Sequence, residues 1–294
     1  MRLSTSTNLF SYRPDGSYIP ILESISRCHK AGYRVVDINL CDALRPYFRI
    51  ADDDWEDWVQ QVRDKLDFLD MTASQSHTPF YNVLDKNFPH REEIELLVKR
   101  SIIASGKLNI PWIVIHSGTY LGENRSRRIS KKENMEYFRP YLELAGKYGS
   151  GIAIENLVDS FCPNKSIGYR EYSSDYENLC DLVDSLGQEF PNVGICWDFG
   201  HANLMHNNQI EALKYIGKRL KATHVADNSG YFDDHIVPFM GRIDWCKIIP
   251  VLREIEYEGD LTYEIHNSSC RIPDSLLDIV GKYTYEVGKV LLQL

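Results

Sequence analysis

The sequence contains no apolar run near the roughly 20 residues that a membrane-spanning helix needs. Its amino-terminal stretch, residues 1–16, lacks the apolar core of a signal peptide. The seven cysteines form no CxxC pair, and their number is odd, so we interpret them as reduced thiols that serve mainly in packing. We therefore expect a cytoplasmic protein that does not enter a membrane.

Motifs for common nucleotide-binding folds are also missing. There is no GxGxxG and no GxxxxGK[ST], which are the fingerprints of open dinucleotide-binding sheets and of P-loops. No Pro/Gly/Ser-rich hinge or low-complexity tract divides the chain. With 43% hydrophobic and 26% charged residues, the composition excludes disordered and fibrous classes. The formal net charge of −9 disfavours nucleic acid as a partner, because an acidic surface repels phosphate backbones.

What the chain does contain is a regular alternation of short β-like runs and amphipathic helical stretches. The runs lie at residues 2–6, 34–39, 72–76, 112–116, 152–155, 194–198, 222–225 and 261–265. Between them apolar residues recur at helical spacing, and a last helical stretch covers 274–292. Two spacings resemble capping boxes, Ser130 to Glu133 and Ser174 to Glu177. Eight β-then-α units predict a single (β/α)₈ TIM barrel that fills residues 1–294 as one domain.

Acidic and imidazole side chains gather where these strands end. In a barrel, the carboxyl ends of the strands carry the active site. A lone histidine or glutamate there is usually a structural hydrogen-bonding or ion-pairing group, but six consecutive strands show the pattern. Inward carboxylates repel one another unless they recruit a cation. The candidate site residues are His77, His116, Glu155, Asp198, His201, His224, Asp233, His235 and Glu264.

Four of these residues terminate the last four strands in order, and we predict that they bind one divalent metal. They are Glu155, Asp198, His224 and Glu264. Oxygen and imidazole ligands suit Mn²⁺, Mg²⁺, Co²⁺ or Zn²⁺. His77, His116, His201, Asp233 and His235 are predicted to bind substrate or additional metal.

Short motifs in a fixed order carry a family resemblance that covers nearly the whole chain. They are LSTST, SHTPFYN, IHSG, AIEN, WDFGH, THVAD, GRIDW and TYEIHN. The chain resembles the xylose isomerase-like barrel superfamily, which holds sugar and sugar-phosphate isomerases and epimerases and also endonuclease IV. The resemblance implies that the metal-binding quartet also supplies the acid/base pair, Glu155 and Glu264. It further implies that His201 contacts the substrate.

The leading hypothesis is therefore a metal-dependent isomerase or epimerase of a sugar or sugar phosphate, which transfers a proton through a metal-stabilised enediolate. His77 and His116 would line its pocket. A dehydratase on the same fold stays open, and a non-enzymatic sugar-binding barrel is disfavoured by the intact quartet. The family relatives often form dimers, which leaves a homo-oligomer open.

The rival hypothesis is a phosphodiesterase with three Zn²⁺ ions, as the resemblance to endonuclease IV implies. All nine candidate residues match positions that hold those ions in that branch. The basic run at residues 124–132 could contact a nucleic-acid backbone or a sugar phosphate, or it could be the solvated start of a helix.

The chain departs from the resemblance in the loop after His235. Relatives usually read Pro-Gly-Glu-Gly before Ile-Asp-Trp, whereas this chain reads Pro238-Phe239-Met240-Gly241-Arg242. One glycine and the glutamate are missing, so the sequence leaves the shape of this loop open.

Overall fold

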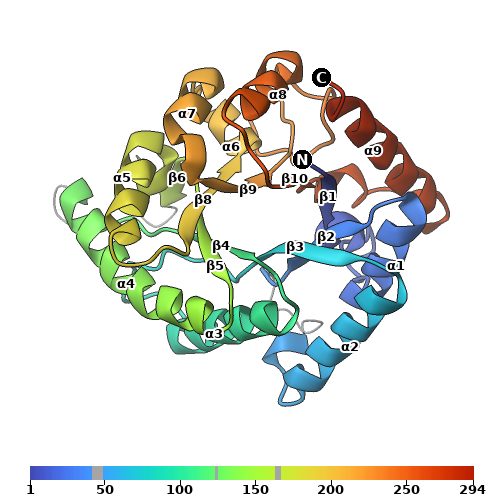
Figure 1. Cartoon of the computed structure of the whole chain (residues 1–294), viewed down its shortest axis with the longest axis horizontal. Helices are drawn as coiled ribbons and strands as arrows, with labels where there is room; N and C mark the ends of the chain where they lie inside the picture. The colour runs from blue at the N-terminus through green and yellow to red at the C-terminus, as the bar shows by residue number, and fades with distance from the viewer. Residues whose placement is uncertain (42–48, 123–124, 163–166) are drawn as a thin grey trace.

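The computed structural model describes residues 1–41, 49–122, 125–162 and 167–294. In these ranges, eight parallel strands form a central barrel and the helices surround it (Figure 1). The strands lie within a residue or two of the predicted runs. Their bounds are β1 (Leu3–Ser6), β2 (Val35–Asn39), β3 (Thr72–His77), β4 (Trp112–His116), β5 (Gly151–Glu155), β8 (Val193–Asp198), β9 (Leu220–His224) and β10 (Leu261–Tyr263).

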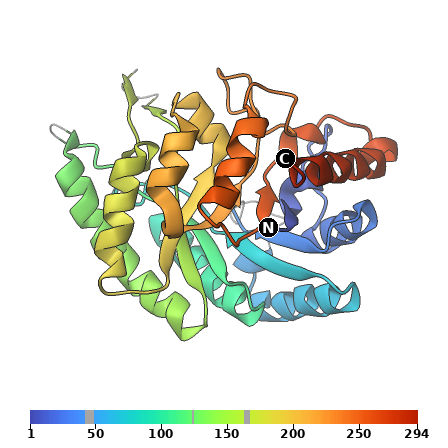
Figure 2. The same cartoon turned by 45° about the horizontal axis from the view of Figure 1, so that its top comes forward.

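The sheet closes on itself, which confirms the predicted TIM barrel. Strand order around it is β10-β1-β2-β3-β4-β5-β8-β9. The two ends of this order meet just beyond β9, where Val225 pairs with Tyr263 in parallel register. The amide of Val225 donates to the carbonyl of Thr262 at 2.7 Å, and the amide of Glu264 donates to Val225 at 3.2 Å. The carboxyl ends of β9 and β10 are thereby tied together, and Figure 2 shows the strands inside their ring of helices.

The helices follow the strands as the apolar periodicity predicts. In α3, for example, Ile94, Val98 and Ile102 are all buried against the barrel. None of the helices in the described ranges is long and apolar enough to cross a membrane. The helix bounds are α1 (Ile21–Ala31), α2 (Trp55–Phe68), α3 (Arg91–Lys107), α4 (Arg127–Lys147), α5 (Tyr176–Gly187), α6 (Phe199–Leu204), α7 (Gln209–Ile216), α8 (Trp245–Glu254) and α9 (Leu277–Leu291).

Both predicted capping boxes are wrong. Helix α4 begins one turn earlier than its spacing indicated, because Ser126 accepts the Ile129 amide and Ser130 lies inside the helix. In α5 the capping residue is Asp175, whose carboxylate accepts the amides of Glu177 and Asn178 at 3.1 and 3.2 Å. A carboxylate oxygen competes well for this position.

An antiparallel hairpin stands between β5 and α5 and was not foreseen. It consists of β6 (Ser160–Cys162) and β7 (Ile167–Tyr169). Each strand has three residues, which is too short for alternation to be read from sequence. The cysteines whose side chains the structure describes are free thiols, as expected.

Strand alternation explains why polar residues meet inside the barrel. On β5, Ile152 and Ile154 face the helices and join the main apolar core. Ala153 faces inward, where it packs in a small separate cluster with Val114, Cys196 and Ala222. Side chains on a strand alternate between its two faces, so the residue two positions beyond each of these points into the same barrel interior. Those residues are His116, Glu155, Asp198 and His224.

A loop from β9 to α8 covers this end of the barrel, and Asp227 organises it. Its buried carboxylate accepts the amides of Phe239 and Ile243 and the indole N–H of Trp245, at 2.9 to 3.1 Å. A Cβ on Gly241 would lie 2.6 Å from the backbone nitrogen of Asn228. Phe239 takes a φ of 73°, so the loop holds a left-handed residue at this position without a glycine.

We expect Gly241→Ala to lower the free energy of unfolding by about 1–3 kcal/mol, since the added methyl group must push aside the Asp227 carboxylate and the Asn228 backbone. The matched control is Gly187→Ala, at a helical position where a Cβ meets only ordinary contacts. That control should raise stability by up to about 1 kcal/mol. Thermal unfolding followed by circular dichroism checks both. Equal behaviour of the two variants would contradict the close approach at Gly241.

Candidate metal centre

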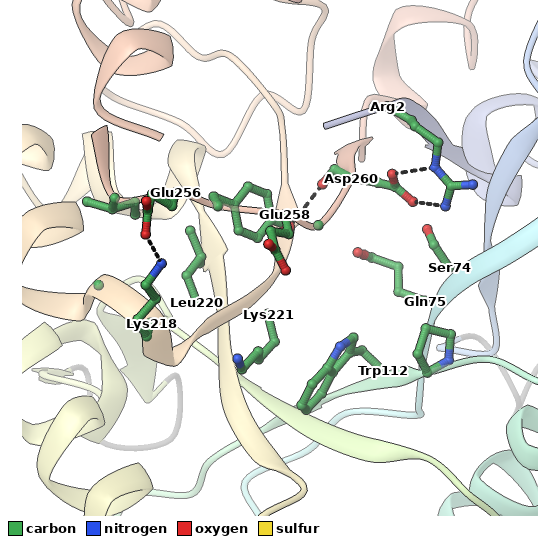
Figure 3. A pocket seen from close by; sticks show the side chains of 15 residues that line it. Arg2, Ser74, Gln75, Trp112, Lys218, Leu220, Lys221, Glu256, Glu258 and Asp260 are labelled. Atoms are coloured by element: carbon green, nitrogen blue, oxygen red, sulfur yellow. Dashed lines mark hydrogen bonds and ion pairs between the residues drawn. The ribbon is translucent and has the colours of Figure 1, made fainter. Parts of the chain in front are cut away.

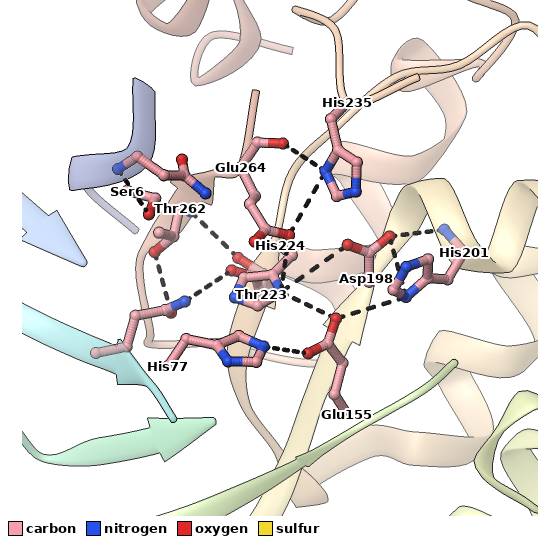
Figure 4. A network of polar contacts seen from close by, with 12 residues as sticks. Ser6, His77, Glu155, Asp198, His201, Thr223, His224, His235, Thr262 and Glu264 are labelled. Atoms are coloured by element: carbon pink, nitrogen blue, oxygen red, sulfur yellow. Dashed lines mark hydrogen bonds and ion pairs between the residues drawn. The ribbon is translucent and has the colours of Figure 1, made fainter. Parts of the chain in front are cut away.

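All nine predicted site residues lie at the carboxyl-terminal end of the barrel, and their side chains form three adjoining groups. Within each group the potential ligand atoms are within 4.8 Å of one another. The central group is the predicted quartet. Figure 4 shows its members pointing toward one another. The groups are Glu155, Asp198, His224 and Glu264; His77, His116 and Glu155; and His201, Asp233 and His235.

Glu155 at the end of β5 is the hub of this arrangement. The residue is only 1% exposed. Its Oε2 is 3.1 Å from Nε2 of both His77 and His116, and its Oε1 is 3.0 Å from Nδ1 of His224. Three imidazoles from β3, β4 and β9 thus surround one buried carboxylate. Such a carboxylate is stable only because hydrogen bonds and opposite charge replace its lost hydration.

The pKa values of these groups are strongly perturbed by one another. Burial raises the pKa of Glu155, but the charges of His224 and His116 and their hydrogen bonds outweigh it and hold that pKa well below its usual range. Burial alone lowers the pKa of His77, but the hydrogen bond and charge of Glu155 raise it to about 9. The pKa of His224 also rises to about 9, since the charges of Glu155 and Glu264 outweigh burial.

Asp198 at the end of β8 is fixed by its neighbours and has one oxygen to spare. Its Oδ1 accepts the His201 amide at 2.6 Å and caps α6. Its backbone amide donates to Asn156 Oδ1, and the Asn156 amide group donates back to the Asp198 carbonyl. Its Oδ2 lies 3.9 Å from His224 Nδ1. The carboxylate is therefore rigidly aimed at the centre of the quartet.

The third group is held by the loop after β9. Asp233 Oδ2 is 2.9 Å from His235 Nε2 and 3.4 Å from His201 Nε2. Burial raises the pKa of Asp233, but its hydrogen bonds to the two imidazoles hold it far below the usual range. His235 has a φ of 43°, and its Nδ1 is 2.9 Å from the Glu264 carbonyl. This link ties the third group to the end of β10.

The residues of the quartet fit a divalent cation. Counting only described residues, Asp198 Oδ2 is buried without a hydrogen-bond partner. This oxygen lies among three carboxylates and one imidazole. A carboxylate oxygen without a hydrogen-bond partner in such a set is available to coordinate a cation. A bound cation would also relieve the repulsion among Glu155, Asp198 and Glu264.

Sequence reasoning missed one buried acid of this region, Asp37 on β2. It is 1% exposed and lies on the inward face of β2, since its neighbours Val36 and Ile38 belong to the outer core. Burial raises its pKa to about 6, although the charges of His224 and His77 oppose that rise. The signal was present, because Asp37 interrupts the buried run VVDIN at an inward position of its strand.

The basic run at residues 124–132 does not face this centre as a free cluster. Asn124 lies outside the described residues, and residues 127–132 form the first turns of α4 rather than a loop. Arg127 pairs with Asp175 and Lys131 with Asp181, at 3.0 and 2.7 Å. These contacts join α4 to the start of α5, so Arg127 and Lys131 serve to hold these two helices together.

Cavities open at both ends of the barrel. The candidate metal centre lies in one of about 510 Å³, lined among others by His77, Glu155 and Glu264. Another of about 570 Å³ lies at the amino-terminal end, where Arg2 pairs with Asp260 and Lys218 with Glu256 (Figure 3). Barrel chemistry occurs at the carboxyl ends of the strands, and four of the charged side chains in the latter cavity are paired with one another. We therefore assign the site to the former.

Known proteins share this architecture. A curated relative, the uncharacterized protein y4fM of Sinorhizobium fredii, is 30% identical over 208 residues, which are 65% of this chain and 60% of that protein. The chain thus spans less than two thirds of that relative. A D-tagatose 3-epimerase-like protein superposes with a TM-score of 0.74 at 22% identity, covering 100% of this chain and 97% of that one.

The IolI protein, solved with a bound zinc atom, superposes with a TM-score of 0.76 at 18% identity, covering 100% and 98% of the two chains. At these identities the solved structures establish the fold. The Xylose isomerase-like TIM barrel family matches residues 25–280. The chain belongs to the xylose isomerase-like TIM barrel family.

Proposed function

We propose that this protein is a divalent-metal-dependent isomerase or epimerase of a sugar, with Glu155, Asp198, His224 and Glu264 as the metal ligands. The observation that carries the proposal is the convergence of these four side chains within 4.8 Å, around an orphaned carboxylate oxygen. The likeness to a D-tagatose 3-epimerase-like protein and to zinc-binding IolI supports the same reading.

A divalent cation held by the quartet would polarise a substrate carbonyl and stabilise the negative charge left by proton removal. The chain's own residues supply the proton transfer. Glu155 and Glu264 come from β5 and from the end of β10, so their carboxylates can act on opposite sides of one substrate carbon. One takes the α-proton and the other returns a proton to the opposite face or to the adjacent carbon.

The remaining imidazoles have positioning roles in this mechanism. His77 and His116 hold Glu155 Oε2 at 3.1 Å each and so fix the carboxylate while Oε1 faces the quartet. His201 is oriented by Nδ1, which is 2.9 Å from the Asn156 carbonyl, and its Nε2 is left to Asp233 or to a substrate hydroxyl. Hydrogen-bonded partners of this kind fix the geometry of metal ligands.

We expect Glu155→Gln and Glu264→Gln each to slow exchange of the substrate α-proton with solvent deuterium by about 10²–10⁴-fold, because an amide cannot act as the base. Exchange is followed by proton NMR of D-tagatose and D-fructose in D₂O with the Mn²⁺-loaded protein. The control is Glu258→Gln, an exposed glutamate at the opposite end of the barrel. Full exchange in both glutamine variants would overturn the assigned roles.

We expect addition of Mn²⁺ to raise the thermal unfolding midpoint of chelator-treated protein, since a ligand that binds only the folded state stabilises it by about 2.7 kcal/mol at one hundred times its dissociation constant. Asp198→Asn should lose most of this rise, because it removes one anionic ligand, whereas Glu258→Gln should keep it. A thermal unfolding midpoint of the wild-type protein that changes with neither metal nor chelator would contradict the metal site.

A second candidate function is a phosphodiesterase with three metal ions, and the grouping of the nine residues favours it specifically. Each of the three groups offers three or four ligand atoms within 4.8 Å, and Glu155 belongs to two of them. Three divalent cations would give this acidic site a net positive charge for a phosphate. Metal analysis separates the candidates, since one equivalent supports the isomerase, and three equivalents with cleavage of abasic-site DNA support the phosphodiesterase.

A further inference from the structure

A second cavity of about 420 Å³ adjoins the metal-centre cavity on the side of β3, β4 and β5. The two cavities share Phe80, His116 and His201 in their walls. Small-molecule sites usually measure about 300–1,000 Å³, so each cavity is large enough for one sugar ring. A ligand at the metal centre therefore has room to continue past the shared residues into a second compartment, whose described lining contains no member of the quartet.

The loops that wall the second compartment are held together at Thr119. The side chain of Asn82, in the loop after β3, accepts the Thr119 amide and donates to the Thr119 carbonyl, both at 2.9 Å. The Thr119 hydroxyl donates to the buried carboxylate of Glu171, which lies just beyond the β6–β7 hairpin. The same hydroxyl accepts the Tyr172 amide at 2.8 Å. The wall is therefore preorganised, and a ligand that binds there does not have to order it.

Half of the residues that line this compartment carry polar or charged side chains. Asp85 and Glu171 contribute carboxylate oxygens to it. Sugar hydroxyl groups can donate to such oxygens. Among the lining residues that the structure describes, none is a lysine or an arginine, the side chains that usually bind phosphate. The compartment therefore suits a neutral polyhydroxylated group better than a phosphate or a wholly apolar group.

One buried hydroxyl of this wall has no partner within the described part of the chain. Ser117 comes directly after β4 and is 2% exposed, yet its Oγ makes no hydrogen bond there. A buried hydroxyl without a partner is costly, because it has lost water without a replacement. Ser117 lines the second compartment, so a hydroxyl group of a ligand there can supply the missing bond.

An aromatic ring stands where the two compartments meet. Phe80 is 56% exposed, and its ring stacks on His116 with the centroids 5.0 Å apart and 28° between the ring planes. The apolar face of a sugar ring packs on an exposed aromatic ring of this kind. The compartment thus combines an aromatic face at its entrance with polar groups farther in, as recognition of a second sugar ring requires.

We infer that the substrate is a neutral reducing disaccharide, with its reducing-end ketose at the metal centre and its second sugar in the second compartment. The glycosidic bond then uses a ketose hydroxyl away from the carbonyl, so the ketose keeps the free carbonyl and the α-protons that proton transfer needs. A ketose is specified because both an epimer and an aldose can form from it. This inference rests on the proposed function for the ketose half.

The test compares D-fructose with two disaccharides of fructose, isomaltulose (6-O-α-D-glucopyranosyl-D-fructose) and lactulose (4-O-β-D-galactopyranosyl-D-fructose). Exchange of the α-protons at C1 and C3 is followed by proton NMR in D₂O with the Mn²⁺-loaded protein. We expect kcat/KM for at least one disaccharide to exceed that for D-fructose by about tenfold, a factor that corresponds to about 1.4 kcal/mol. Two disaccharides that are no better than D-fructose would overturn the inference, as would a preference for D-fructose 6-phosphate over D-fructose.

A serine variant locates the preference in the second compartment. Ser117→Ala should reduce the disaccharide-to-fructose ratio of kcat/KM by about threefold to tenfold, because it removes one hydrogen bond to the second sugar. Both sugars are measured on the same variant, so damage to the metal centre cancels in the ratio. The matched control is Ser74→Ala, which removes another unpartnered serine hydroxyl, in the cavity at the opposite end of the barrel. That control should keep the wild-type ratio.

A second variant fills the compartment. Leu157→Trp, in its wall, should bring the ratio to one or below, since the larger side chain takes the space of the second sugar. Val290→Trp, at an exposed position on α9, should leave the ratio unchanged. A ratio that survives both Ser117→Ala and Leu157→Trp would place the second sugar elsewhere and overturn the inference.

The outcome is separable from that of the proposed function. A wild-type protein that exchanges the α-protons of D-fructose but prefers neither disaccharide keeps the proposed function and loses the inference. Isothermal titration calorimetry covers the opposite case, since it needs no turnover. A protein that binds isomaltulose at least about tenfold more tightly than D-fructose, and exchanges no proton of either, loses the proposed function but keeps the second compartment as a sugar site.

Discussion

The burial of the Glu155 charge is the constraint on which the rest of this site depends. A carboxylate that is 1% exposed must find compensation inside the protein, because hydration is lost. Three imidazoles from three different strands provide it through both carboxylate oxygens. Asp198 and Glu264 add negative charge within 4.8 Å, which the imidazoles alone balance poorly. The fold thus concentrates the negative charge of three carboxylates at one point of its interior, where a cation would be stabilised.

Much of this was predictable from sequence, because the acidic and imidazole residues follow the ends of successive predicted strands. Each apolar run of the barrel is buried on both faces, so its inward positions are fixed by parity once its end is known. In the structure, Glu155 lies two residues beyond inward Ala153 and His224 lies two beyond Ala222, as this parity requires. The same logic applied to β2 would have found Asp37. Asp37 was missed because the prediction considered only residues at strand ends, and Asp37 lies in the middle of its strand.

Other features escaped prediction for physical reasons. Neighbouring residues can compete to cap the same helix. Asp175 caps α5 through its carboxylate, while the hydroxyl of Ser174 donates to Asp159 instead. The β6–β7 hairpin has strands too short to show a period. In the loop after His235, the sequence showed that a glycine was missing but not the consequence. Phe239 adopts the left-handed backbone itself, at a cost of roughly 1–2 kcal/mol for a residue with a Cβ, and Asp227 holds the loop around it.

The nine site residues need not all be metal ligands to explain why they lie together. His77 and His116 both bond Glu155 Oε2, and this leaves Oε1 toward the quartet. Asp233 bonds His235 and His201 at once, and His235 in turn contacts the Glu264 carbonyl. Each outer group therefore satisfies its own hydrogen bonds while it orients a member of the quartet. A single cation with a hydrogen-bonded frame uses every one of these contacts. A cation on the quartet would replace only the contact between His224 and Glu155, whereas cations on the outer imidazoles would also replace their contacts to Glu155 and Asp233, since an imidazole nitrogen bound to metal cannot donate to a carboxylate at the same time.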